Sequence, residues 1–241
     1  TGSSTSESFR IDAFVQGLDK LGYAEGNNIS LVLRFGEGKL DRLPALAADL
    51  VAKKVDIIFT GDTPTTRAAK QGTSNIPIVF ATVGDPVGSG LVASLAKPAE
   101  NITGLSSVAR DLVAKRLQIL KEVFPRITRV AIFTSGAQAG AIAEAERAAK
   151  ALGMQTVAVQ LERREDVKQV ATRLKEWHAD SLSFLQSGTN LYNRKLLGEF
   201  AATMRLPAVA GTKEFAEAGA FISYGANYAS NYFRAATYVD K

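Results

Sequence analysis

The sequence predicts an α/β protein made of two lobes, each with a parallel β-sheet. Short runs of β-branched and aromatic residues alternate with amphipathic helical stretches, which is the pattern of βαβ units. The alternation occurs as two successive series that join near residues 103–107. The chain has 241 residues, a length that suits two lobes of about 100–150 residues each.

The first series is defined by periodicity, caps and helix breakers. Phe14, Val15 and Leu18 form an apolar helical stripe that ends at Gly22. Asp41 is placed to cap a helix, and the run VDIIFT (55–60) is typical of a strand buried on both faces. The expected helices cover 9–21, 43–51, 65–71 and 91–96, and the expected strands cover 29–35, 55–60, 76–81 and 102–105.

The second series repeats the pattern and completes the second lobe. The expected strands cover 130–133, 154–161, 181–185, 207–210 and 221–224, and the expected helices cover 112–124, 139–152, 164–177, 191–204 and 229–241. No long Pro- or Ser-rich linker separates the series, so short crossings should form a hinge between the lobes. We therefore expect two Rossmann-like lobes: residues 1–104 with 226–241, and residues 105–225.

Composition excludes several classes of function. The chain has no Cys and a single His, which excludes disulfides, thiol nucleophiles and Cys-based metal sites. Gly36-Glu37-Gly38 lacks the third glycine of a dinucleotide fingerprint, and no phosphate-binding loop ending in Gly-Lys-Ser/Thr occurs. We predict no metal and no cofactor. No run of about 18 apolar residues is present, so no membrane span is expected.

The net charge of +5 does not indicate a nucleic-acid partner. A basic chain can bind nucleic acid, but the positive residues here are spread singly over the expected helices. Arg163 and Arg164 form a short pair that Glu162 and Glu165 flank. This pattern is typical of solvated helix faces.

Small polar residues and glycines follow the strands at their carboxyl ends, where open α/β sheets bind ligands. These loops read TGDTP (60–64), TVGDP (82–86), TSGAQ (134–138), QSGTN (186–190) and GT (211–212). Glycine lets the backbone approach a ligand, and helix N-termini offer free N–H groups. Ordinary helix capping needs the same residues, so both interpretations stay open for each loop. Tyr224 lies where the chain should recross between the lobes and could stack on a ligand.

The sequence offers only weak candidates for a catalytic site. His178 follows Trp177 near a helix end and has the position of a surface or C-terminal capping residue. Asp62 and Asp85 both follow strands and could pair as carboxylates, although each is also placed to cap a turn or a helix. We predict that the protein is not an enzyme.

Several stretches give the chain a resemblance to the substrate-binding proteins of ABC importers of the tryptophan/tyrosine-transport type. The resemblance covers essentially the whole chain, and the stretch at 83–92 is the most specific. The matching stretches are GL (17–18), LGY (21–23), EGNN (25–28), EGK (37–39), DRLP (41–44), AAKQ (68–71), IPIVF (76–80), VGDPVGSGLV (83–92), NITGL (101–105), SYG (223–225) and RAATYVDK (234–241).

This resemblance implies a type I periplasmic-binding-protein fold with a ligand cleft between hinged lobes. It also implies a periplasmic or other extracytoplasmic location, reached after removal of a signal peptide or held by a lipid anchor. The partners that it implies are a permease and its ATPase. The ligand would be a small organic molecule such as an amino acid, an aromatic compound or a carboxylate. By position in the family, the expected ligand-binding residues are Ser4, Thr5, Thr60, Thr63, Pro64, Gly84, Asp85, Ser135, Gln186, Ser187 and Thr212, to which we add Tyr224.

Two departures from the family pattern bear on the ligand and on the ends of the chain. Members that hold amino acids resemble one another in an acidic residue at the loop that here reads Gln186-Ser187-Gly188-Thr189, which is neutral. A first strand is expected before Thr1 and further strands after Lys241, which would make 1–8 a strand-to-helix loop. The alternatives to solute transport are a ligand-sensing domain of a receptor or repressor and an enzyme on the same scaffold.

Overall fold

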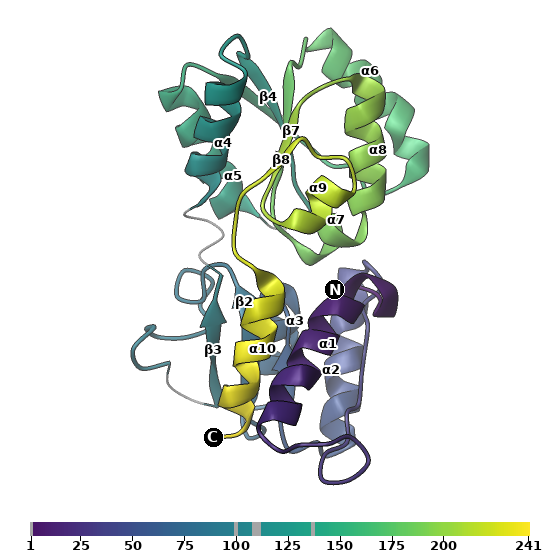
Figure 1. The fold of residues 1–241 in the computed structure, drawn as a ribbon, viewed down its shortest axis with the longest axis vertical. Helices are drawn as coiled ribbons and strands as arrows, with labels where there is room; N and C mark the ends of the chain where they lie inside the picture. Colours follow the sequence, from purple (N-terminus) through teal and green to yellow (C-terminus); the bar gives the residue numbers. More distant parts are fainter. Residues whose placement is uncertain (1, 99–100, 108–111, 136–137) are drawn as a thin grey trace. The chain divides into compact units, whose positions relative to one another are not determined.

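The computed structural model describes residues 2–98, 101–107, 112–135 and 138–241 (Figure 1). Contacts within the chain divide it into two compact units. Unit 1 consists of Thr1–Val108 with Asn227–Lys241, and unit 2 consists of Ala109–Ala226. Each unit contains its own parallel sheet, so each is described by itself.

Unit 1 is a parallel sheet in the order β1-β2-β3 with helices on both faces (Figure 1). Leu50 and Ala69 pack on one face against Ile78 and Phe80. The other face is covered by α1 and α10, which lie side by side because Gly17 lets the backbones approach. The elements are α1 (Ser4–Lys20), η1 (Leu40–Arg42), α2 (Leu43–Ala52), β1 (Ile58–Thr60), α3 (Thr63–Gly72), β2 (Ile78–Val83), β3 (Ile102–Ser106) and α10 (Tyr228–Val239).

Unit 2 is a parallel sheet in the order β5-β4-β6-β7-β8. Register pairs join Phe133 to Phe184, and Phe184 to Ala210. The carboxyl ends of β4, β6 and β7 therefore lie side by side at one edge of the sheet. The elements are α4 (Leu112–Val123), β4 (Arg129–Phe133), α5 (Ala139–Ala151), β5 (Gln155–Val159), η2 (Arg164–Asp166), α6 (Val167–Glu176), β6 (Ser181–Phe184), α7 (Gly188–Tyr192), α8 (Arg194–Met204), β7 (Ala208–Ala210), α9 (Lys213–Glu217) and β8 (Ile222–Ser223).

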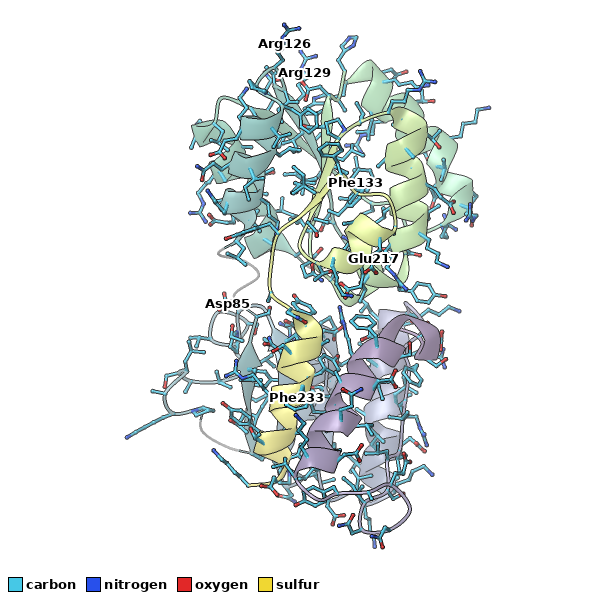
Figure 2. The ribbon with its side chains drawn as sticks, viewed as in Figure 1. Asp85, Arg126, Arg129, Phe133, Glu217 and Phe233 are labelled. Atoms are coloured by element: carbon cyan, nitrogen blue, oxygen red, sulfur yellow. The ribbon has the colours of Figure 1, made fainter. Side chains whose placement is uncertain are left out.

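The core of unit 2 follows the alternation of side chains along its strands. Ile132 faces α4 and α5, where it packs with Leu117 and Ala145. The next residue, Phe133, faces the opposite layer and contacts Phe184 and Phe200 (Figure 2). Strands buried on both faces explain the continuous apolar runs in the sequence. These two layers hold the strand ends, and therefore the loops that follow them, in fixed positions.

Several expected elements are wrong in the structure. Residues 29–35 form no strand, because the bridge from Glu25 to Ile29 is the only pairing recorded there among the described residues. Residues 91–96 form bends instead of a helix, since Ala93 N donates to the Pro98 carbonyl and Lys97 N donates to Ser94 Oγ. The helix expected at 191–204 is two helices that meet at Asn193.

The loop expected through residue 8 is also wrong, because α1 begins at Ser4. Glu7 lies in the first turn of this helix, where a negative charge is favourable, and it forms an ion pair with Arg10 at 3.2 Å. Among the described residues, no helix is both long and apolar enough to cross a bilayer.

Candidate functional site

The loops after β4 and β6 meet at the point where the strand order of unit 2 reverses. From β4 the chain moves outward to β5, and it then returns to β6 on the other side of β4. Open α/β sheets bind ligands at such a reversal, beyond the carboxyl ends of the strands. Ser135 Oγ and Ser187 Oγ lie 2.6 Å apart there and share a hydrogen bond. The structure thus brings together two residues of the predicted site.

Gln138 and Asn190 hold these two loops in place. Gln138 Oε1 accepts hydrogen bonds from Thr134 Oγ1 (3.0 Å) and Ser135 N (2.9 Å). Gln138 Nε2 donates to the carbonyl of Gln186 at 2.8 Å. Asn190 Nδ2 donates to the carbonyl of Phe133, which ends β4 (3.1 Å), and to that of Leu185, the residue after β6 (2.8 Å). Sequence reasoning placed both amides in polar loops but missed this role, because it depends on contacts about 50 residues apart.

Among the described residues, three side-chain oxygens that follow β6 and β7 are buried without a hydrogen-bond partner: Gln186 Oε1, Thr212 Oγ1 and Glu214 Oε2. Thr212 is 4% exposed and Glu214 is 7% exposed. Buried polar atoms of native proteins are nearly always paired with protein, water or a ligand. These oxygens are therefore the polar groups of unit 2 most in need of an outside donor.

Arg116 fixes the segment that leads out of unit 2. Its side chain is 3% exposed, and Nε donates to the carbonyl of Tyr224 at 2.7 Å. A Cβ atom at Gly211 would lie 3.1 Å from Arg116 Nη2, and one at Gly225 would lie 3.3 Å away. Both glycines therefore leave room for the guanidinium group. The side chain of Tyr224 itself is accessible, since the residue is 42% exposed.

In unit 1, the loop after β1 uses its polar groups to build the start of α3. Asp62 Oδ1 accepts from Thr65 N at 3.0 Å, and Thr65 Oγ1 accepts from Asp62 N at 3.2 Å, which is a capping box. Thr60 Oγ1 lies 2.8 Å from Thr66 Oγ1, and both residues are buried. Thr63 and Pro64 are the first two residues of α3. The capping interpretation is confirmed for Asp62.

The loop after β2 is organised in the same way. Asp85 Oδ1 accepts a hydrogen bond from Gly88 N at 2.8 Å and closes a turn, next to the half-buried Gly84. Thr82 Oγ1 donates to the carbonyl of Gly61, which ties this loop to the loop after β1. Asp62 and Asp85 thus each accept a backbone hydrogen bond within their own helix start or turn.

Comparison with known proteins identifies the family. The family model for ABC transporter substrate binding proteins matches residues 4–241. The chain belongs to this family. A solved structure of a conserved domain protein from Vibrio cholerae is 25% identical with a TM-score of 0.89, and the match covers 100% of this chain and 81% of that chain. The fold is therefore that of a type I periplasmic binding protein.

Two further relatives carry names that specify a ligand. An ABC domain from Streptococcus pneumonia, solved in complex with L-Trp, is 17% identical with a TM-score of 0.85; the match covers 100% of this chain and 82% of that chain. The tyrosine-binding protein of Clostridioides difficile is 32% identical over 119 residues, which are 49% of this chain and 34% of that protein. The matched part thus spans about a third of that curated relative.

The start of this substrate-binding protein is helical. Ser4 is the first residue of α1 and is exposed. Thr5 follows it in α1, and its side chain lies outside the described part of the chain, as do Gly136 and Ala137 of the loop after β4. Near the end of α6, His178 is exposed with a φ of 56°, as expected for a residue that ends a helix. In the described ranges, no group of three or more His, Asp or Glu side chains is placed to hold a metal ion.

Sequence reasoning also missed a buried charge in unit 1 of the substrate-binding protein. Arg10 is 3% exposed and forms an ion pair with Glu7. Its guanidinium carbon lies 4.8 Å from the ring centroid of Tyr228 and 5.9 Å from that of Tyr232, within the range of cation–π contacts. Burial raises the pKa of Tyr232 above its usual range, and the charge of Glu7 acts in the same direction. This cluster joins α1 to α10.

Proposed function

We propose that this chain is the solute-binding component of an ABC importer, which captures a small organic molecule and presents it to a permease. The observation that carries the proposal is the family match over residues 4–241. The polar strand-end loops of unit 2, with Ser135 and Ser187 at the reversal of strand order, support it. The ligand contacts are assigned to the loops that contain Thr60, Thr63, Pro64, Gly84, Asp85, Ser135, Gln186, Ser187, Thr212 and Tyr224, with Ser4 and Thr5 at the start of α1.

The mechanism is closure of two lobes around the solute. A ligand that contacts both lobes stabilises the closed state, since only that state offers both sets of contacts. The hinge would lie in the crossings between units 1 and 2, which include the segment that Arg116 holds at Tyr224. The ligand leaves unchanged, so no catalytic group is needed.

The partners follow from the same assignment. The permease would recognise the closed form, and an ATPase would drive transport. The protein would work outside the cytoplasm, in a periplasm or on a lipid anchor. The family match favours this role over the ligand-sensing domain of a receptor or repressor, which would use the same closure for a different output.

A thermal-shift screen of amino acids, aromatic acids and other small carboxylates tests the proposed function. A ligand at about 100 times its Kd stabilises the native state by about 2.7 kcal/mol, which corresponds to a rise in Tm of roughly 5–10 °C for a chain of this size. Mass spectrometry of the released compound should show unchanged ligand. Conversion of the ligand would instead indicate an enzyme, and the absence of any hit across the screen would contradict solute binding.

A further inference from the structure

We propose that Glu214, together with Thr212 and Gln186, binds a protonated amine of the ligand. This inference rests on the proposed function and narrows its substrate class. Glu214 lies in α9, which follows β7, and not in the loop after β6, where the family pattern places an acidic residue and this chain has Gln186. The ligand class that follows is a primary ammonium compound, such as an amino acid, in preference to a plain carboxylic acid.

Gln186 and Thr212 follow neighbouring strands of the sheet, β6 and β7. Phe184 of β6 pairs with Ala210 of β7, so Gln186 and Thr212 each lie two residues beyond a paired position. A Cβ atom at Gly211 would lie 2.4 Å from Gln186 Oε1, which places this amide oxygen directly over the backbone next to Thr212. Glu214 follows two residues later in α9.

The unpaired oxygens of Gln186, Thr212 and Glu214 can accept hydrogen bonds and lack donors. Each of the three buried atoms without a partner is an oxygen, and one belongs to a carboxylate. A carboxylate oxygen that is buried without a donor keeps its desolvation cost, and Glu214 Oε2 is such an oxygen among the described residues. Arg116 lies near Gly211 but directs Nε to the Tyr224 carbonyl, and none of its nitrogens bonds to these oxygens.

An ammonium group matches these three oxygens. It carries a positive charge and donates three hydrogen bonds, and charge-assisted hydrogen bonds are about twice as strong as neutral ones. A carboxylate ligand placed at the same oxygens would add a like charge beside Glu214. The cluster therefore selects for an amine and against an acid at this position.

The chain offers a matched control on the same helix. Glu217 ends α9 (Figure 2), and its side chain is 64% exposed, where it bonds to Lys213 Nζ at 3.3 Å. Glu214→Gln and Glu217→Gln remove the same charge from the same helix, but only the first alters the buried cluster. Thr212→Val keeps the shape of the side chain and removes one acceptor, so it provides a second variant if Glu214→Gln fails to fold.

Calorimetric titration of the full chain tests the inference with compounds that differ only in the amine. The pairs are L-tyrosine with 3-(4-hydroxyphenyl)propanoate, L-tryptophan with indole-3-propanoate, and L-leucine with 4-methylpentanoate; 4-hydroxybenzoate is added as an aromatic acid. We expect the amine-bearing member of at least one pair to bind at least 10-fold more tightly than its partner. Glu214→Gln should weaken that binding by about 10- to 100-fold and Thr212→Val by about 3- to 10-fold, whereas Glu217→Gln should leave it within twofold.

The outcomes separate this inference from the proposed function. If the acids bind as tightly as the amines, or if Glu214→Gln and Thr212→Val leave amine binding unchanged, the inference is overturned while solute binding stands. If no compound of the panel binds, both fail for these ligand classes. Circular dichroism and the Tm of each unliganded variant establish that the altered protein is folded.

Discussion

The strand-end loops of the two units have similar composition but use their polar groups differently. In unit 1, the carboxylates of Asp62 and Asp85 accept hydrogen bonds from the backbone of their own helix or turn. In unit 2, the segments after β6 and β7 bury three oxygens that bond to none of the described residues. The comparison teaches that composition alone does not separate a capping loop from a binding loop, whereas the hydrogen-bond partners of each group do.

Unit 2 also contains both kinds of polar residue side by side. Gln138 is bonded at both ends of its amide, while the amide oxygen of Gln186 has no partner. Gln138 thus holds the two loops together, whereas no described residue bonds to the amide oxygen of Gln186. Substitutions of these residues and of Asp62 therefore test the comparison directly.

The largest expected effect is that of Gln138→Leu. The substitution removes three hydrogen bonds and leaves Thr134, Ser135 N and the Gln186 carbonyl without this partner. We expect the free energy of unfolding to fall by about 2–3 kcal/mol, because buried polar groups that lose a partner keep their desolvation cost. Urea denaturation followed by circular dichroism measures the change. A loss below about 0.5 kcal/mol would show that water replaces the amide and that Gln138 does not hold the loops.

A smaller loss is expected in unit 1 from Asp62→Ala. The substitution removes the acceptor of the capping box at the start of α3 and should cost about 1–2 kcal/mol. Asp62→Asn is the matched control, since asparagine caps helices as well as aspartate does and should cost less than about 0.5 kcal/mol. Equal losses for the two variants would mean that the charge of Asp62, and not its capping bond, stabilises the unit.

The sequence predicted the fold class well because periodicity and helix breakers are local signals. The alternation of apolar runs with amphipathic stretches predicted most strands and helices of both units, and the motif around Gly84 indicated the family. The strand expected at 29–35 failed for a physical reason: an extended, apolar stretch becomes a strand only when a neighbouring strand bonds to it. Pairing of that kind is not a local property.

The site was less predictable than the fold. Polar loops at strand ends were recognisable, and the bond between Ser135 and Ser187 joins two of the predicted residues. The burial of Glu214 was not predictable, because it depends on how α9 packs on β7 and β8. A sequence shows which residues carry a charge, but it does not show which polar side chains are buried without a hydrogen-bond partner.

The smallest expected effect, Gln186→Leu, is the sharpest test of the contrast with Gln138. Leucine has a similar volume and removes a buried oxygen that has no partner. We expect the unliganded protein to be unchanged or stabilised by up to about 1 kcal/mol, because replacing an unpaired buried polar group with an apolar one is neutral or favourable. Binding of an amine should weaken at the same time, so stability and affinity move in opposite directions. A loss of stability like that of Gln138→Leu would show that Gln186 is part of the scaffold, and the distinction between bonded and available groups in unit 2 would then fail.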